Sequence, residues 1–325
     1  MRLSVAEKEE IIHLVERSEL GVGKTLQQLG IHKGTFYRWY KAYLNKAEVA
    51  QSGATPSRRQ WNTIPEAQKN LVVEIALEHP ELSPRELAVK LTDEQRVFIS
   101  ESSVYRILKA KGLVTSPAHI LLSASNEFRY KTAFVHQMWQ TDFTYFKIIG
   151  WGWYYLSTVL DDYSRFIVHW ELCESMKVED VQRTVDHGMD KAALSKQQRP
   201  KLLSDNGSCY IASELKTYMD AKQIKHIHGR PLHPQTQGKI ERYHRSMKNV
   251  VKLDHYYCPE ELNAALESFV YHYNHKRYHE SLDNVTPADV YFGRKGQILK
   301  QREKIKQQTL LKRRRLYQKE KLVNL

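Results

Sequence analysis

The sequence predicts an α/β core that follows all-α helix-turn-helix units and precedes a basic tail. Three observations lead to this prediction. Apolar side chains recur at helical spacing over the first third of the chain, strand-like segments rich in aromatic and branched residues begin near residue 136, and residues 291–325 hold 12 Lys and Arg against 2 Asp and Glu. The predicted parts are a helix-turn-helix at 1–50, a linker at 51–62, a second helix-turn-helix at 63–115, a linker at 116–135, the α/β core at 136–292 and the basic tail at 293–325.

The first 50 residues have the order of a helix-turn-helix unit. A helix begins near Ser4, a candidate cap, and a short second helix ends at Gly30. A third helix spans about 33–44. In this layout the first residues of the last helix enter the major groove of DNA. A plain helical bundle has the same apolar pattern and stays open as an alternative. The candidate DNA contacts are Lys33, Thr35 and Arg38.

A second helical unit follows a linker in which Gly, Pro and Ser accompany two arginines. Its middle helix opens with Ser83, Pro84 and Glu86, the signature of a capping box with proline in the first turn. Its last helix spans about 101–111 and is stopped by a glycine. The layout is again that of a helix-turn-helix, and the candidate DNA contacts on its last helix are Ser102 and Arg106.

From residue 138 the pattern changes to strands. Three antiparallel strands are expected in the segments MWQTDFTYFKII, WYYLSTVLD and RFIVHWELC. Two short strands, KLLSD and IKHIHG, then alternate with helices, which is an α/β layout. The helices are expected at about 178–194, 213–222, 237–252 and 259–275.

Three carboxylates stand where a metal site is expected. Asp142 lies within the first strand, Asp205 ends the strand KLLSD, and Glu241 lies inside a helix. Ligand sites on such sheets collect at strand ends. An acidic group inside a strand is costly unless it is paired or bound to a cation. Three converging carboxylates would form an oxygen-rich site suited to Mg²⁺ or Mn²⁺.

Five segments occur in order between residues 136 and 292: WQTDFTYF, LDDYSRFI, LSDNG, HPQTQGKIERYHRSMK and YNHKRYHESLDNVTP. Together they resemble the integrase core of insertion-sequence transposases, which belong to the DDE superfamily with the retroviral integrases. The resemblance implies a ribonuclease H-like fold. It assigns Asp142, Asp205 and Glu241 as catalytic metal ligands, and it matches Lys248, two helical turns after Glu241, to a basic residue on the same helix face. The DNA contacts expected on this helix are Lys239, Arg245 and Lys248.

The function implied by the resemblance is that of a DNA transposase. Such an enzyme binds the ends of a mobile element, cleaves DNA to leave 3′-hydroxyls and joins them to target DNA, with two Mg²⁺ or Mn²⁺ ions per active site. Neither a protein nucleophile nor ATP is needed, and the sequence has no Walker-type loop. The expected partners are element ends and target DNA, bound by a homo-oligomer. A nuclease of the same fold without strand transfer, a sequence-specific DNA-binding regulator with an inactive core and an RNA-binding protein remain as alternatives.

Other polar groups in the core have simpler interpretations. Asp161 and Asp162 precede Tyr163-Ser164 and are expected in a turn. Trp151 and Trp153 are expected to pack on the first hairpin rather than to stack on bases. Three histidines lie on or beside one helix, but no carboxylate or cysteine completes a zinc set, so packing or DNA contact is favoured. These are His272, His275 and His279.

The charge balance points to a polyanionic partner. The net charge is +13, of which residues 291–325 carry +10, and nucleic acid is the commonest such partner. The tail is expected to contact phosphates without regard to sequence, as a helix or as a disordered segment. A solvated tail and a helix joining two protomers are the competing interpretations, the latter through a stripe of Ile305, Leu310, Leu311 and Leu316.

The remaining composition favours a soluble intracellular protein. No apolar stretch is long enough to cross a bilayer, and the first residues lack the apolar segment of a signal peptide. No membrane partner is expected, and a cytoplasmic, nucleoid-associated protein of a bacterium is predicted. The three cysteines are far apart, so neither a disulfide framework nor a cysteine-based zinc site is expected.

Overall fold

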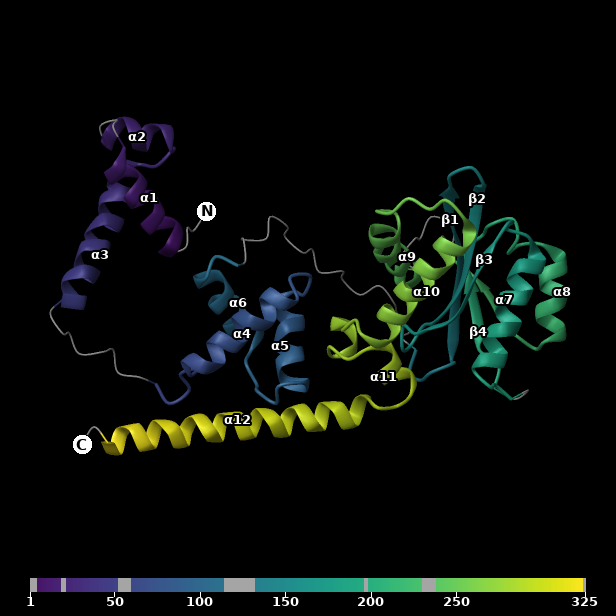
Figure 1. Ribbon diagram of the computed structural model, residues 1–325. Coiled ribbons are helices and arrows are strands. Elements are labelled where there is room, and N and C mark those ends of the chain that lie inside the picture. The colour runs from purple at the N-terminus through teal and green to yellow at the C-terminus, as the bar shows by residue number, and fades with distance from the viewer. Residues whose placement is uncertain are drawn as a thin grey trace. The chain divides into compact units, whose positions relative to one another are not determined.

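The computed structural model describes residues 5–18, 22–51, 60–113, 132–195, 198–229 and 238–323. Contacts divide the chain into two compact units (Figure 1). The N-terminal unit contains Met1–Ile120 together with Leu299–Leu325, and the core unit contains Leu121–Ile298. The last residues of the chain therefore belong with the helices that precede the core. Within the described residues, no helix is both long and apolar enough to cross a membrane.

Three helices form the first predicted helix-turn-helix. Its small apolar core contains Ile12, Leu26 and Phe36. Gly30 adopts a φ of +66°, a conformation that glycine adopts without strain, and so lets the chain turn between the second and third helices. The third helix is longer than predicted, and the predicted cap Ser4 lies outside the described residues. The helices are α1 (Val5–Arg17), α2 (Val22–Gln28) and α3 (Lys33–Gln51).

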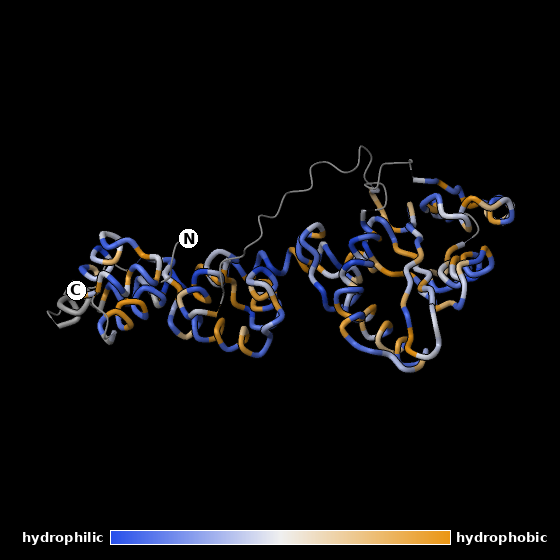
Figure 2. The backbone as a smooth tube through the Cα atoms, turned by 90° about the horizontal axis from the view of Figure 1, so that it is seen from above, coloured by the Kyte–Doolittle hydropathy of each residue, from blue (hydrophilic) through white to orange (hydrophobic). Residues whose placement is uncertain are grey.

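The second predicted unit also consists of three helices. Ser83 caps the middle helix in the predicted capping box, because its side chain accepts from the Glu86 amide and Glu86 accepts from the Ser83 amide. Alternation of hydrophobic and hydrophilic residues along these helices is visible in Figure 2, as expected for helices buried on one face. The helices are α4 (Glu66–Glu78), α5 (Pro84–Asp93) and α6 (Glu101–Ala110).

The basic tail is a single helix, α12 (Lys295–Val323), which packs against α4–α6 (Figure 1). Arg302 donates two hydrogen bonds to Asp93, from Nε at 2.8 Å to one carboxylate oxygen and from Nη2 at 2.7 Å to the other. The Thr309 hydroxyl accepts from the Phe98 amide. Arg313, only 6% exposed, donates to the Gln68 side chain and to the Phe98 carbonyl. The three contacting residues are seven and four positions apart, spacings that lie on one side of a helix, so one face of α12 packs on the second helical unit.

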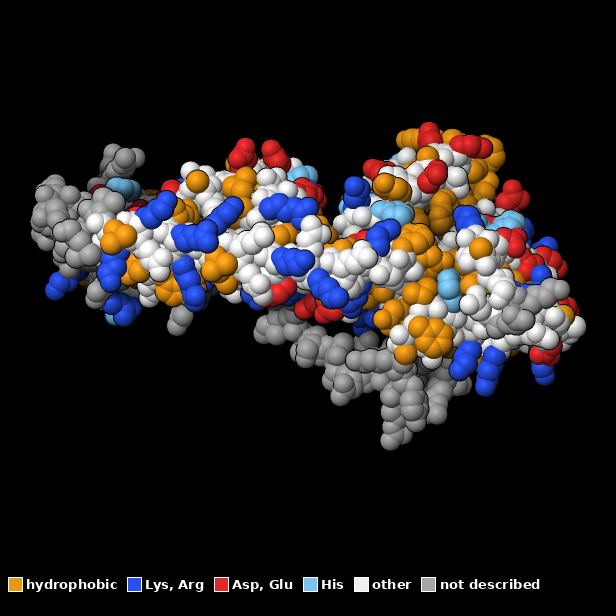
Figure 3. All heavy atoms as spheres, turned by 90° about the horizontal axis from the view of Figure 1, so that it is seen from below, with side chains coloured by type: hydrophobic (Ala, Val, Ile, Leu, Met, Phe, Trp, Pro, Cys, Tyr) orange, Lys and Arg blue, Asp and Glu red, His pale blue; other side chains and the backbone are white. Residues whose placement is uncertain are grey.

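The predicted apolar stripe of the tail is wrong in part. Ile305 is buried, but Leu311 and Leu316 are 52% and 47% exposed. The buried face is instead polar and ionic, which is why apolar periodicity did not reveal it. The opposite side keeps a row of cations, visible in the view from below in Figure 3. Exposed Lys and Arg residues on α12 include Lys300, Lys304, Lys312, Arg315 and Lys319.

The Arg302–Asp93 contact predicts a measurable stability effect. Arg302→Ala removes a two-pronged ionic hydrogen bond between partly buried groups and should destabilise the second helical unit by about 1.5–3 kcal/mol. Hydrogen exchange of the α4–α6 amides in the full-length protein measures this loss. Arg315→Ala removes an exposed charge from the same helix and is the matched control. Equal exchange rates in the two variants would contradict the docking of α12.

The core unit is built on a five-stranded mixed sheet in the order β3-β2-β1-β4-β5. The first three strands are antiparallel neighbours, as predicted, and β4 and β5 add in parallel. Aromatic and β-branched residues dominate the long strands, whose pleated faces they fill well. The strands are β1 (Met138–Ile148), β2 (Gly152–Asp161), β3 (Ile167–Cys173), β4 (Lys201–Ser204) and β5 (His226–His228).

Helices cover both faces of this sheet (Figure 1). Phe146 and Ile148 of β1 face α9 and α10, while Trp139 of the same strand faces α7 and α8. Successive β1 residues therefore point to opposite layers, as the strand period of two requires. The helices are α7 (Val178–Lys191), α8 (Ser213–Ala221), α9 (Gly238–Val251), α10 (Pro259–His275) and α11 (Pro287–Tyr291), with a 3₁₀ turn at Glu280–Leu282.

Candidate active site

Asp142 and Asp205 lie on neighbouring strands at matching positions. The parallel ladder between β1 and β4 pairs Gln140 with Leu203. Continuing this register by two residues sets Asp205, which directly follows β4, opposite Asp142. Adjacent strands are roughly 4.8 Å apart, so both carboxylates reach the same small region.

A tight turn holds the Asp205 side chain. Its Oδ1 atom accepts a hydrogen bond of 2.9 Å from the Gly207 amide. A Cβ atom on Gly207 would lie 3.0 Å from that same oxygen, closer than side chains normally approach. Glycine at this position therefore leaves room for the carboxylate, and any larger residue pushes against it. The DNG sequence after β4 is explained by this contact.

Cys209 and Tyr210 lie within electrostatic reach of both Asp142 and Asp205. Burial raises the pKa of the Cys209 thiol, and the charges of Asp205 and Asp142 raise it further. Burial likewise raises the pKa of Tyr210, with both aspartates again adding to the shift. The charges of both carboxylates therefore act on Cys209 and on Tyr210, in agreement with the strand register that puts Asp142 opposite Asp205.

Glu241 is brought to β1 by contacts on either side of it in α9. The Ile240 amide donates to the Gln140 side chain, and His244 Nδ1 lies 3.4 Å from Asp142 Oδ2. Glu241 itself is exposed and lies one turn before His244. The N-terminal end of α9 is therefore fixed beside the strand that carries Asp142.

His244 is a site residue that the sequence analysis missed. It is buried, and its ring nitrogen nearest β1 faces the carboxylate of Asp142. In the segment HPQTQGKIERYHRSMK, site roles were predicted only for acidic and basic residues. His244 follows Glu241 by one helical turn, and this spacing could have indicated that it faces the same site. The five residues of this segment before Gly238, 233–237, lie outside the described residues.

Lys239 does not face solvent, which corrects its prediction as a DNA contact. Its ammonium lies 2.5 Å from Asp162 Oδ2 and donates to the Asp162 carbonyl at 2.8 Å. Asp162 is 2% exposed and also accepts from Gln140 and Thr132. A buried charge is costly unless paired, so Lys239 serves as the counter-ion of Asp162 and ties α9 to the β2–β3 turn.

The other predicted DNA contacts remain available at the surface. Arg245 is exposed on α9. Burial and the neighbouring Lys252 lower the pKa of Lys248, while the charge of Asp142 raises it, so Lys248 lies within electrostatic reach of the site. On α3 and α6, the core is made by other side chains such as Phe36 and Val104. The residues left exposed or half-buried there are Lys33, Thr35, Arg38, Ser102 and Arg106.

Asp161 closes the turn after β2, because it accepts from the Ser164 amide and hydroxyl and from the His136 amide, so the turn prediction is confirmed. Trp153 contacts Tyr145 across the hairpin, yet Trp151 is 59% exposed. The three histidines expected to pack or to contact DNA form no group close enough to hold a metal in the described part of the chain, and His272 and His275 are exposed. Burial lowers the pKa of His279 to about 3, as expected of a packed histidine.

A separate group of ligand-type side chains lies on β3 and α7. His169, Glu171 and His187 place one ligand atom each within 4.8 Å of one another. Arg183 occupies the second oxygen of Glu171 at 2.7 Å. Imidazole nitrogens suit zinc better than magnesium, and the carboxylate is already satisfied by three donors. This group is explained as an ion-pair cluster between strand and helix.

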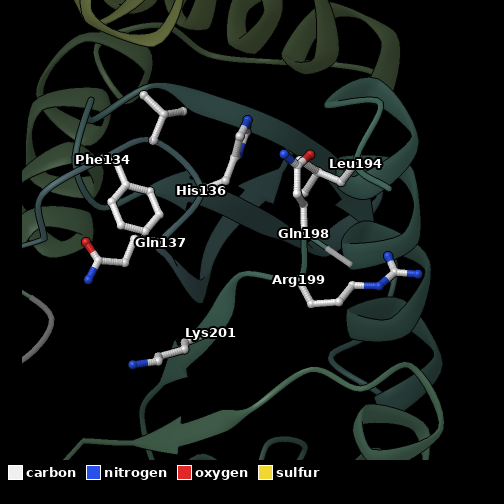
Figure 4. A pocket seen from close by; sticks show the side chains of 8 residues that line it. Phe134, His136, Gln137, Leu194, Gln198, Arg199 and Lys201 are labelled. Carbon is white, nitrogen blue, oxygen red and sulfur yellow. The ribbon is translucent and has the colours of Figure 1, made fainter. Parts of the chain in front are cut away.

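A pocket of about 460 Å³ opens at the other end of β1 and β4 (Figure 4). His136 and Gln137 line it from the segment before β1, and Arg199 and Lys201 from the segment that leads into β4. Asp205 follows the opposite end of β4. The pocket is therefore distinct from the site of the three carboxylates.

Comparison with known proteins bears on the whole core unit. Models described as integrase core domains match residues 134–234 and 222–287, and a homeodomain-like domain model matches residues 35–108. The Gag-Pro-Pol polyprotein of Mason-Pfizer monkey virus is 30% identical over 37% of this chain, and that of squirrel monkey retrovirus is 32% identical over 35%. The chain spans only 6% of the length of each polyprotein.

The HTLV-2 integrase catalytic core domain, solved with magnesium, is 19% identical, with 49% of this chain and 97% of that chain covered and a TM-score of 0.38. The two matching core models overlap at residues 222–234 and together cover the five strands, α7–α10 and all three carboxylates. Residues 134–287 are therefore similar to an integrase core domain and form a ribonuclease H-like fold, and the helices at residues 35–108 are similar to a homeodomain-like domain.

Proposed function

We propose that this protein is a DNA transposase whose Asp142, Asp205 and Glu241 carry out strand cleavage and strand transfer. The observation that carries the proposal is the matching register of Asp142 and Asp205, with α9 anchored beside them on both sides of Glu241. A nuclease or a regulator needs no second use of the same site, so the reaction products decide between these functions.

The three side chains fit divalent metal ions. All three offer carboxylate oxygens, which Mg²⁺ and Mn²⁺ prefer. None of them pairs with a lysine or arginine among the residues whose positions are described, so their negative charge is left for another cation. When bound, two magnesium ions would neutralise charge at the phosphate and favour ionisation of the attacking hydroxyl. His244 would keep the Asp142 carboxylate oriented toward the site.

The proposed reaction has two steps, a hydrolysis and a transesterification. Water first attacks a phosphorus at the element end, the bond to the 3′-oxygen breaks, and a 3′-hydroxyl is released. That hydroxyl oxygen then attacks a phosphorus of the target, a new P–O bond forms, and the target 3′-oxygen leaves with a proton. One phosphodiester replaces another in the second step, so ATP is not required.

The helical units supply DNA recognition in this proposal. Arg38 and Arg106 are exposed on the last helices of the two units and would approach base edges, while neighbouring lysines contact phosphates. The exposed cations of α12 add contacts that do not depend on sequence. A homo-oligomer would bring two element ends together at one target.

A joining assay tests the proposal. The full-length protein is incubated with Mg²⁺, a supercoiled target plasmid and a labelled duplex taken from the DNA that flanks the gene. A transposase yields labelled plasmid, a nuclease yields shortened label only, and a regulator yields bound but intact DNA. A shuffled duplex and EDTA are the controls, and both should abolish joining. Failure to join any terminal sequence from either flank would refute the transposase assignment.

A further inference from the structure

An exposed aromatic and basic surface lies on the β1–β2 hairpin, beyond the catalytic strand position. Tyr145 and Trp153 are 50% and 52% exposed, and their rings meet edge to face with centroids 5.4 Å apart. Three ammonium groups lie over these rings: Lys248 and Lys252 are 5.1 and 5.7 Å from the Tyr145 centroid, and Lys147 is 5.9 Å from that of Trp153. We call these five residues the aromatic shelf.

The shelf is assembled from both layers of the core unit. Tyr145, Lys147 and Trp153 share one face of the hairpin, because their positions pair directly or diagonally in the β1–β2 ladder. Lys248 and Lys252 come from α9, which packs on the opposite face. The described ladder between β1 and β4 ends at Gln140, so the edge of β1 beyond it is where these long side chains pass.

The chemistry of the shelf selects a particular ligand. Exposed rings with flat faces bind apolar or aromatic groups. The ammonium groups of Lys248 and Lys252 both lie over the Tyr145 ring and repel one another, and Lys252 adds to the effect of burial in lowering the pKa of Lys248. A ligand that supplies both aromatic faces and negative charges satisfies the two requirements together. Unpaired nucleotides do so, because bases stack on aromatic side chains while phosphates neutralise lysines.

The position of the shelf relates it to the site of reaction. Tyr145 follows Asp142 by three residues on the same strand, a rise of roughly 10 Å at about 3.4 Å per residue, so the two side chains point to opposite faces of the sheet. Stacked DNA advances about 3.4 Å per nucleotide along one strand, so this span is roughly three nucleotides. Lys248 connects the two positions around the edge of β1, because its ammonium lies 5.1 Å from the Tyr145 ring centroid and within electrostatic reach of Asp142. We propose that the aromatic shelf binds unpaired nucleotides of the DNA strand adjoining the phosphate that is cut, with bases on Tyr145 and Trp153 and phosphates on Lys147 and Lys252. The proposal rests on the proposed function.

Binding without cleavage tests the shelf. The full-length protein is titrated in EDTA with two labelled forms of the element end, one fully paired and one with three unpaired nucleotides at the terminus, and anisotropy gives Kd. Trp153→Ala and Tyr145→Ala should weaken binding of the unpaired form about fivefold to hundredfold and leave the paired form unchanged. Trp153→Phe and Tyr145→Phe keep an aromatic ring and should bind the unpaired form about as tightly as the wild type does. Trp151→Ala, on the same hairpin and 59% exposed, is the matched control and should have no effect.

Two further measurements locate the contact. Lys252→Gln should flatten the slope of log affinity against log salt by about 0.7 for the unpaired form. A 5-iodouracil in the unpaired segment should crosslink to Trp153 or Tyr145, as read by mass spectrometry. Equal losses on both DNA forms, crosslinks confined to other residues, or a fall in oligomer mass caused by Trp153→Ala with binding unchanged would each overturn the proposal. If the wild type joins DNA but the shelf substitutions do not change binding, the shelf proposal is wrong and the proposed function stands. If binding depends on the shelf but no joining occurs, the proposed function is wrong and the shelf proposal stands.

Discussion

Asp205→Asn is expected to lower strand cleavage by roughly a thousandfold, while binding to element ends stays within about twofold. The amide keeps the shape of the side chain but removes a negative oxygen from a site whose metal ions contribute several kcal/mol, and each 1.36 kcal/mol is tenfold in rate. The same loss is expected for Asp142→Asn and Glu241→Gln. Single-turnover cleavage of a labelled end in Mg²⁺, beside a binding titration in EDTA, separates the two effects.

The matched control for this series is Asp220→Asn. Asp220 is an exposed aspartate on α8, outside the candidate site. It should cleave as the wild type does, which excludes a general effect of lost negative charge on DNA affinity. Near-normal cleavage by Asp205→Asn would remove Asp205 from the catalytic set.

Lys239→Met is expected to destabilise the core unit by about 3–5 kcal/mol, because it leaves the carboxylate of Asp162 buried without its counter-ion. The two side chains are 11% and 2% exposed, so water does not replace the lost partner. Adding Asp162→Asn to the same protein should recover a large part of the loss. Thermal unfolding and hydrogen exchange of the α9 amides measure both variants.

A surface ion pair on the same unit gives the comparison. Lys222 contacts Asp186 at 2.7 Å, but these side chains are 39% and 37% exposed. Lys222→Met should therefore cost less than about 1 kcal/mol. A loss for Lys239→Met no greater than that for Lys222→Met would mean that the buried pair does not anchor α9.

Local signals predicted the order and type of nearly all helices and strands of the two units. Ser83-Pro84 and Glu86 gave the start of α5, and alternating aromatic and branched residues gave β1 to β3, because capping and strand patterning act over a few residues. The same signal was present and overlooked at Thr286-Pro287, where Thr286 caps α11 in a capping box with Asp289. Proximity in sequence therefore explains most of what was predicted.

The features that the sequence did not predict depend on contacts between residues far apart in the chain. Lys239 next to Glu241 has the charge expected of a phosphate contact, and only the fold shows that Asp162, 77 residues earlier, takes that charge. His244 is unremarkable in sequence until β1 brings Asp142 to its ring. The face of α12 is polar, so its partners Asp93 and Phe98, more than 200 residues away, leave no apolar period to read.

The return of α12 to the second helical unit has a consequence for synthesis of the chain. The core unit is inserted between α6 and α12, so a ribosome completes the core before it makes the helix that Asp93 and Phe98 bind. At roughly 5–20 residues per second, the stretch between them takes roughly 10–40 s to translate. During that interval α4–α6 exist without their fourth helix. In the proposed function, the unit that would read DNA is consequently finished last, after the core that would cut it, and a ribosome that stops within the core releases a product whose second helical unit lacks α12.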